Sequence, residues 1–174
     1  MSHEPLYANG RALTLDKRVG KGGEGEVFSV SNLPGYAVKR YLNALVAERE
    51  PKIRALVASQ LADSVPTVAF PCQVVENKQG KFVGFLMRLV DKHKEIHELQ
   101  TPTSRQKHFP KADYRFIVRV ALNVARVMAQ LHAQGCVVGD INQRGILVSP
   151  EATVVLIDAD SFQVNAGVRD WLCA

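Results

Sequence analysis

The sequence has 174 residues, of which 47% are hydrophobic, and a formal net charge of +5. This length and composition exclude a disordered chain and predict a globular protein with one sizeable core or two small lobes. Because the basic residues are scattered among acidic ones, a mildly basic surface is favoured over binding to nucleic acid or membranes.

The N-terminus shows no basic region followed by an apolar run, and no stretch suggests a membrane span. The three cysteines are widely spaced and form no CxxC pair, which argues against a disulfide framework and against a structural zinc site. We therefore expect a cytoplasmic protein with reduced thiols.

The first half of the sequence alternates in the manner of a sheet. Residues 13–41 predict an antiparallel meander of three strands, interrupted by a glycine-rich turn. Residues 47–61 predict a helix, in which Pro51 allows regular structure only from about that point onward. Two further strands are expected at 70–75 and 82–90, which gives a five-stranded sheet with one helix.

The second half contains the firmest helix prediction. Residues 101–110 are polar and contain prolines, which predicts an exposed connection. A long helix follows, because apolar residues recur at helical spacing over 117–131, with Asp113 as a cap and Gly135 just past the end. Three short apolar runs come after it, at residues 136–138, 146–148 and 154–157.

A glycine-rich run, Gly20-Lys21-Gly22-Gly23-Glu24-Gly25-Glu26-Val27, joins the first two strands of the meander. Without Cβ atoms its backbone amides can approach phosphate groups. A dinucleotide-binding loop would lead straight into a helix, whereas residues 26–30 read as a strand, so a Rossmann fold is excluded. Lys39 ends the third strand, and its ammonium is expected beside the loop. Taken alone, the glycine-rich run also fits an ordinary hairpin turn, and Lys39 also fits a solvated lysine at a strand end.

Two aspartates follow apolar strands in the second half. Asp140 heads a tight loop after residues 136–138, and Asp158 directly follows residues 154–157. Either one alone is explained by a turn aspartate that bonds its own backbone. Together, two carboxylates at the ends of adjacent strands suit a base for a hydroxyl nucleophile and a ligand for magnesium, a hard cation that prefers oxygen.

In this order the motifs resemble those of the protein-kinase superfamily, over residues 13–164. The resemblance implies an α+β, bilobal fold. Residues 1–90 would form the N-lobe, a five-stranded antiparallel sheet with one helix and a hinge at 88–90. Residues 91–174 would form a partial helical C-lobe that ends within the activation segment, as in a piece of a longer protein.

The resemblance also implies functional roles for individual residues. Lys39 would hold the phosphates of ATP and pair with a helix glutamate, for which Glu50 is the first choice and Glu48 the alternative. Asp140 would be the catalytic base and Asp158 the ligand of a magnesium ion (Mg2+). The implied nucleotide-binding residues are Gly20, Gly22, Gly23, Gly25, Val27, Ala37, Lys39, Met87 as gatekeeper, Arg88 and Val90.

The sequence departs from the kinase pattern at two functional positions. Val138-Gly139 replaces the usual His-Arg before the catalytic aspartate, so control by a phosphorylated activation loop is not expected. Gly145 stands where kinases have a metal-binding asparagine, and Asn142 or Asp160 is the expected substitute ligand.

The functional hypotheses follow from these residues. One is a Ser/Thr-type kinase that transfers phosphate from Mg-ATP to a protein hydroxyl. The alternative is a pseudokinase that binds a nucleotide or a partner protein with little or no catalysis, and a small-molecule phosphotransferase of related fold is a third option.

A closer resemblance rests on the motifs at residues 139–143 and 158–163. They are similar to those of bacterial kinase-like proteins that are fused to helix-hairpin-helix modules or found in tellurite-resistance-associated phosphorylation systems. The partners implied are ATP and a protein substrate or partner protein, with neither membrane nor nucleic acid indicated.

Overall fold

The computed structural model describes residues 5–166 and 169–171, which form two compact units. Among the described residues, the first unit comprises 5–64 and Phe70–Leu89, and the second comprises Val65–Ala69 and the residues from Val90 onward. The division near the hinge falls one residue before the expected boundary at residue 90. A short excursion of the chain, Val65–Ala69, also joins the second unit, where Val68 pairs with Leu156 in a parallel bridge.

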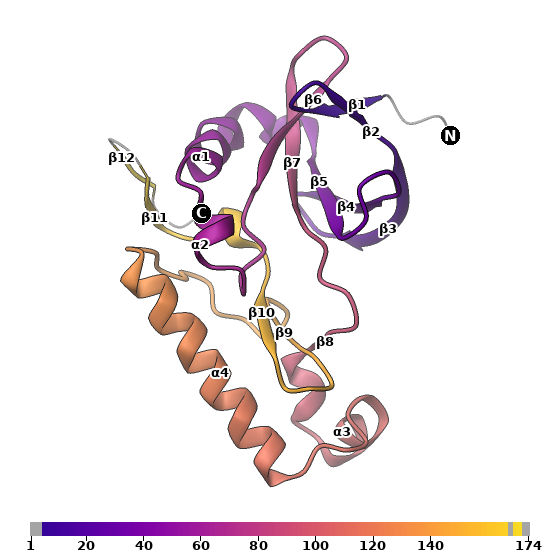
Figure 1. Cartoon of the computed structure of the whole chain (residues 1–174), viewed down its shortest axis with the longest axis vertical. Coiled ribbons are helices and arrows are strands. Elements are labelled where there is room, and N and C mark those ends of the chain that lie inside the picture. Colours follow the sequence, from indigo (N-terminus) through magenta and orange to yellow (C-terminus); the bar gives the residue numbers. More distant parts are fainter. Residues whose placement is uncertain (1–4, 167–168, 172–174) are drawn as a thin grey trace. The chain divides into compact units, whose positions relative to one another are not determined.

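The first unit is built on a curled antiparallel sheet of seven strands in the order β2-β1-β6-β7-β5-β4-β3 (Figure 1). Its strands are β1 (Leu6–Ala8), β2 (Arg11–Leu13), β3 (Leu15–Lys21), β4 (Gly25–Val30), β5 (Tyr36–Tyr41), β6 (Gln73–Asn77) and β7 (Phe82–Arg88). A buried cluster of alternate residues holds the sheet together, and it comprises Leu6, Ala8, Leu13, Val30, Val38, Val75 and Leu86.

Two of these strands, β1 and β2, lie outside the five that the sequence led us to expect. They form a hairpin whose turn is Asn9-Gly10, with φ angles of 47° and 76°. An Asn-Gly pair is a strong signal for such a turn because both positions need positive φ. Each strand is only three residues long, too short for alternation to stand out.

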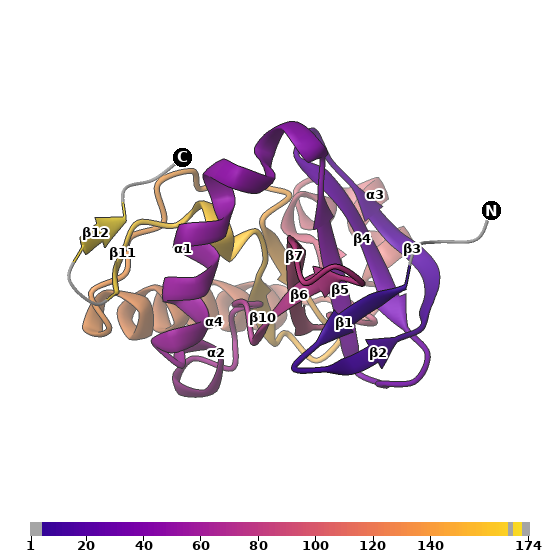
Figure 2. The ribbon, with the colours of Figure 1, turned by 90° about the horizontal axis from the view of Figure 1, so that it is seen from above.

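Helix α1 (Val46–Ala58) packs on β6 and β7 (Figure 2). The expectation that regular structure begins only at Pro51 is wrong, because the helix starts at Val46, directly after the 3₁₀ turn η1 (Asn43–Leu45). Pro51 cannot donate to the carbonyl of Ala47, but both residues are exposed, so water can satisfy that carbonyl. A short helix, α2 (Leu61–Ser64), ends this stretch of the first unit.

Helix α4 (Tyr114–Ala133) is the longest element of the second unit. Both expected boundary signals are confirmed: Asp113 accepts a hydrogen bond from the Phe116 backbone N–H at 2.8 Å, and Gly135 follows the helix with a φ of 71°. Contrary to the expectation from the sequence, α4 is long and apolar enough to span a membrane by length and composition alone. That is weak evidence, because core helices of soluble proteins pass the same test.

The rest of the second unit consists of short elements. A sheet in the order β10-β9-β8 contains β8 (Lys94–Glu95), β9 (Ile146–Val148) and β10 (Val154–Leu156), and β11 (Val164–Ala166) pairs with β12 (Arg169–Trp171). The remaining elements are the 3₁₀ turns η2 (Ile96–Leu99) and η3 (Ala159–Ser161) and the helix α3 (Pro102–His108).

Helix α3 lies where the sequence predicts an exposed connection. The segment is largely exposed, as expected, but it is helical rather than irregular. Thr101 caps it by accepting from the Ser104 N–H at 3.2 Å, and Pro102 occupies the first helical position, where no N–H is needed. The same threonine and proline that suggested a loop are therefore the start signals of a helix.

Candidate functional site

The glycine loop is the tip of the β3–β4 hairpin. The Gly22 N–H donates to the Gly25 carbonyl at 2.9 Å and closes the tip. A Cβ on Gly25 would lie 2.2 Å from the Arg40 carbonyl oxygen, so the close approach of β5 requires glycine there. At Gly22 and Gly23 a Cβ would meet nothing within 4 Å. The loop therefore has one glycine needed for packing and two that leave open space for a ligand.

Lys39 lies in the middle of β5, opposite Val27 of β4 and Phe85 of β7. Its side chain is buried, and the ammonium lies 3.6 Å from Glu24 Oε2 in the glycine loop and 5.5 Å from the centre of the Tyr41 ring. The structure therefore brings Lys39 and the glycine loop together through an ion pair.

Glu50, the first-choice partner of Lys39, binds elsewhere. Its carboxylate pairs with Arg54, one helical turn further on, at 2.8 Å. Glu48, the alternative, is exposed. The α1 side chain that reaches the glycine loop is Arg49, whose Nη2 lies 2.5 Å from Glu24 Oε1. The expected Lys39–Glu50 pair is thus not formed in this structure, and Glu24 joins Lys39 to Arg49 instead.

The orientation of α1 explains this correction. The choice of Glu50 assumed that Ile53 and Val57 face inward. In the structure Ile53 and Leu56 are fully buried and Val57 is only partly buried. A helix turns by about 100° per residue, so the residue one turn before the buried Ile53 is Arg49.

The residues expected around adenine lie on neighbouring strands of the first unit. Ala37 is fully buried and faces Met87 across the β5–β7 ladder, and Val27 lies on the adjacent strand β4. Arg88 ends β7 and directs its side chain to Asp63, at 3.6 Å. Val90, the last of the expected adenine contacts, is the first residue after the division between the units.

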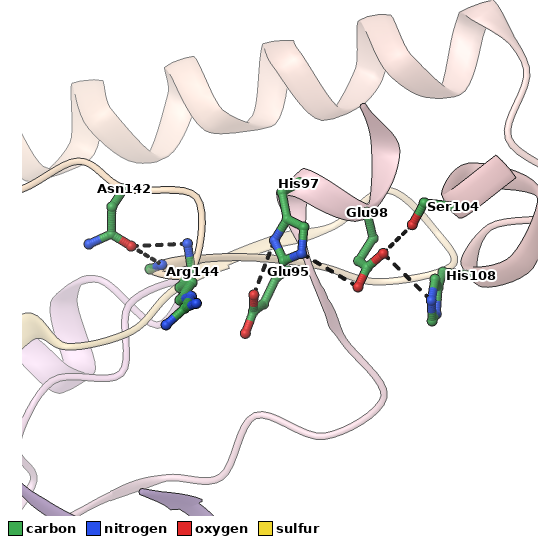
Figure 3. A network of polar contacts seen from close by, with 8 residues as sticks. Glu95, His97, Glu98, Ser104, His108, Asn142 and Arg144 are labelled. Atoms are coloured by element: carbon green, nitrogen blue, oxygen red, sulfur yellow. Dashed lines mark hydrogen bonds and ion pairs between the residues drawn. The ribbon is translucent and has the colours of Figure 1, made fainter. Parts of the chain in front are cut away.

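Asp140 is exposed and is oriented by Asn142. The Asn142 Nδ2 donates to Asp140 Oδ2 at 3.0 Å. The Asn142 Oδ1 accepts from the backbone N–H groups of Arg144 and Gly145, each at 3.0 Å, and the bond to Arg144 is visible in Figure 3. This side chain fixes the loop and one oxygen of Asp140. Both lone-pair directions of its amide oxygen are then in use, so Asn142 does not fit the expected role of metal ligand in this arrangement.

The two aspartates after β10 differ in accessibility. Asp158 is exposed and has a φ of 59°, a left-handed conformation that is sparsely populated outside glycine and is often found at functional sites. The Ser161 hydroxyl donates to its carbonyl at 2.8 Å and stabilises the turn. Asp160 is buried and takes part in contacts within the chain. Of the expected ligands, Asp158 therefore fits a hard cation best.

In the part of the chain that the structure describes, no group of three or more His, Cys, Asp or Glu side chains lies close enough to hold a metal ion. A cavity of about 10 Å³ beside Asp140, lined by Met128 and Ile146 among others, has room for about one water molecule and not for a substrate.

A polar cluster that was not expected from the sequence ties η2 to α3 (Figure 3). The Ser104 hydroxyl donates to Glu98, and the imidazoles of His108 and His97 lie 3.5 Å from the two oxygens of the same carboxylate. The hydrogen bond from Ser104, with help from the nearby histidines and Lys107, lowers the pKa of Glu98 below its usual value of 4.5. The local spacing of these residues gives no hint of the cluster, because it forms only once α3 folds.

A curled sheet with a lysine beside a glycine loop, and a second unit with two aspartates after short strands, are features of a protein-kinase-like fold. No family model matches the sequence. The chain is 35% identical over 170 residues to Protein kinase YegI of Escherichia coli O157:H7, and 35% identical over 167 residues to Protein kinase YegI of Escherichia coli strain K12. The alignments cover 97% and 95% of this chain but 26% of each relative, so the chain spans about a quarter of their length.

A solved structure with a similar fold is the ROP18 kinase domain in complex with AMP-PNP and sucrose. The TM-score is 0.65 at 18% sequence identity, and the match covers 95% of this chain and 57% of the other. The α+β, protein-kinase-like fold expected from the sequence is therefore confirmed.

Proposed function

We propose that the domain binds ATP and transfers its terminal phosphoryl group to a Ser or Thr hydroxyl of a protein. The observation that carries the proposal is the buried ammonium of Lys39 beside a glycine loop whose tip is open at Gly22 and Gly23. A buried cation next to accessible backbone amides is the arrangement that favours a polyphosphate. The similar proteins are named as protein kinases, and the structural neighbour is in complex with AMP-PNP, which supports this choice.

Each unit would supply its own groups. In the first unit, Lys39 would neutralise phosphate charge and the backbone amide of Gly23 would bind a phosphate oxygen. In the second unit, Asp140, held by Asn142, would orient the acceptor hydroxyl and accept its proton. Asp158 would be the ligand of Mg2+, and the bound ion would neutralise charge on the phosphates.

A pseudokinase is the second candidate, and specific observations favour it. The amide oxygen of Asn142 is already used by two backbone N–H groups, Gly145 has no side chain, and Asp160 is buried. Of the expected metal ligands, Asp158 alone would then offer an exposed carboxylate, which is enough for binding and weak for catalysis.

The test is to incubate the protein with radiolabelled ATP, Mg2+ or Mn2+, and a mixture of Ser- and Thr-containing protein acceptors. We expect transfer that falls roughly 100-fold or more in Asp140→Asn, because general-base catalysis contributes about that much. Asp91→Asn is the matched control, since Asp91 is also exposed and its Oδ1 only accepts from the next backbone N–H.

The outcomes separate the candidates. Absence of transfer together with a rise in melting temperature on adding ATP would favour the pseudokinase. Transfer that is unchanged in Asp140→Asn would refute the assigned role of Asp140. No transfer and no thermal shift would refute nucleotide binding itself.

A further inference from the structure

We propose that Glu24 in the glycine loop is a built-in competitor for the phosphate site, and that Arg49 of α1 is a second phosphate-binding cation beside Lys39. The inference deepens the proposed function and rests on it, because it names the groups that a nucleotide's polyphosphate would contact. All three residues belong to the first unit.

The carboxylate of Glu24 is shared by two cations. Its Oε1 lies 2.5 Å from Arg49 Nη2, and its Oε2 lies 3.6 Å from Lys39 Nζ. The side chains of Lys39 and Arg49 are only 9% and 11% exposed, whereas that of Glu24 is 40% exposed. The cations are therefore nearly enclosed by the fold, and the carboxylate is the accessible member that an incoming anion can replace.

Arg49 offers more hydrogen-bonding capacity than Glu24 uses. Its Nε is buried and has no hydrogen-bond partner among the described residues. Nε and Nη2 form one edge of the guanidinium, and such an edge binds two oxygens of a phosphate or carboxylate side by side. Glu24 contacts only the Nη2 end. An unpaired buried donor beside the phosphate loop indicates that a larger oxyanion fits this edge better than the carboxylate does.

The loop does not need the Glu24 side chain to keep its shape. Its backbone is held by two hydrogen bonds of 2.9 Å, from the Gly22 N–H to the Gly25 carbonyl and from the Leu42 N–H to the Glu24 carbonyl. Replacing the carboxylate should therefore leave the hairpin intact and remove the negative charge that Arg49 and Lys39 share. This separates the proposed competition from a purely structural ion pair.

The competition has a measurable consequence. A polyphosphate must displace the Glu24 carboxylate, so the apparent affinity is lowered by the fraction of molecules in which Glu24 occupies the cations. Ligands without phosphate, such as adenosine, do not have to displace the Glu24 carboxylate. The effect should therefore scale with the phosphate part of the ligand.

The experiment is calorimetric titration of the protein with ATP, adenosine and inorganic tripolyphosphate. We expect Glu24→Gln to bind ATP and tripolyphosphate about tenfold more tightly, by removing a competing charge, with adenosine unchanged. Arg49→Met should bind both phosphate ligands about tenfold more weakly, since a charge-assisted bidentate contact is lost, and should reduce the gain from Glu24→Gln in the double variant. Arg49→Lys, which keeps the charge but not the two-donor edge, should lie between them.

Matched controls come from neighbouring residues. Glu26→Gln removes the same charge from the same loop, but Glu26 pairs with the exposed Arg18 at 2.8 Å, so no gain is expected. Arg54→Met removes a cation from α1 whose partners are Glu50 and Glu76, so no loss is expected. The melting temperature of each variant, measured without ligand, checks that it is folded.

Distinct results overturn the inference and the proposed function. If Glu24→Gln and Glu26→Gln increase the affinity for ATP equally, the increase comes from the change in net charge alone and the inference is overturned. Unchanged ATP binding in Arg49→Met would also overturn it, while leaving the proposed function in place. If ATP binds to no variant but tripolyphosphate binds to Glu24→Gln through Arg49, the proposed function fails and the anion site stands. If neither ligand binds to any variant, both fail.

Discussion

Gly25 and Gly84 show at the residue scale how the strand that carries Lys39 is packed. A Cβ on Gly25 would lie 2.2 Å from the Arg40 carbonyl oxygen, and one on Gly84 would lie 2.0 Å from that of Lys39. The two glycines belong to β4 and β7, the strands on either side of β5. Glycines in both neighbouring strands therefore allow β5 to pack closely between β4 and β7.

We predict that Gly25→Ala lowers the free energy of unfolding by roughly 1–3 kcal/mol, as overpacking usually does. Gly23→Ala is the control in the same loop, where a Cβ meets nothing within 4 Å, and it should change stability by less than about 0.5 kcal/mol. Urea unfolding of both variants measures the difference. Equal effects would mean that the loop, rather than the contact with β5, determines the cost.

The cluster around Glu98 gives a prediction for pH. The pKa of Glu98 is lowered in the folded state, chiefly by the Ser104 hydroxyl, so the unfolded chain binds protons more readily in the acid range. The stabilisation is present above the unfolded pKa and is lost as the pH falls through the folded pKa. We expect Ser104→Ala to lose less thermal stability than the wild type between about pH 5 and pH 3.

Ser104→Thr keeps the hydroxyl and should behave as the wild type does in the same thermal melts. If the thermal stability of the wild type and of Ser104→Ala falls in parallel over this pH range, the hydrogen bond from Ser104 does not control the ionisation of Glu98.

At the element scale, α4 has one face in the core and one face in solvent. Val120, Val127 and Leu131 are buried, whereas Val118 and Leu122 are about half exposed. Leu131 is 0% exposed and Leu122 is 48% exposed, so the helix offers the same side chain in two environments.

We predict that Leu131→Ala lowers the free energy of unfolding by roughly 2–5 kcal/mol, through lost burial and a cavity. Leu122→Ala on the same helix should cost less than about 1 kcal/mol, because little burial is lost. Denaturant unfolding followed by circular dichroism compares them. A large cost for Leu122→Ala would mean that this side of α4 is covered in solution, for instance by a second copy of the chain.

At the scale of the whole molecule, each unit contains one cysteine among the described residues, Cys72 in the first and Cys136 in the second. Burial raises the pKa of both thiols, so each has less reactive thiolate at neutral pH than a free cysteine. Cys136 is buried and Cys72 only partly so. The two thiols are therefore separate reporters of the two units.

We predict that alkylation of the native protein at neutral pH is slower than that of a free thiol, and slowest at Cys136. As urea is added, the alkylation rate of each cysteine should rise when its own unit unfolds. Mass spectrometry of the labelled peptides measures these rates. The experiment uses a Cys173→Ser background, because Cys173 lies outside the described residues. Rapid labelling of Cys136 in the native protein would contradict the packing of the second unit.

Much of the fold could be predicted from the sequence because its signals are local. The caps of α4, its apolar periodicity and the β9–β10 hairpin are each encoded within a few consecutive residues. The glycine run and Lys39 were recognisable for the same reason, since chain flexibility and residue chemistry do not depend on distant contacts. The Asn9-Gly10 turn was equally local, although its strands were too short to confirm it.

Tertiary structure alone decided which side chains reach the site. Packing of Ile53 and Leu56 against the sheet rotates α1 so that Arg49, and not Glu50, faces the glycine loop. The closing of the loop after Asp140 uses up the amide oxygen of Asn142, and folding buries Asp160. The sequence by itself determined which kinds of groups are available for phosphate chemistry. Their partners depend on helix rotation and burial, because one residue changes a helix direction by about 100° and no local pattern fixes that angle.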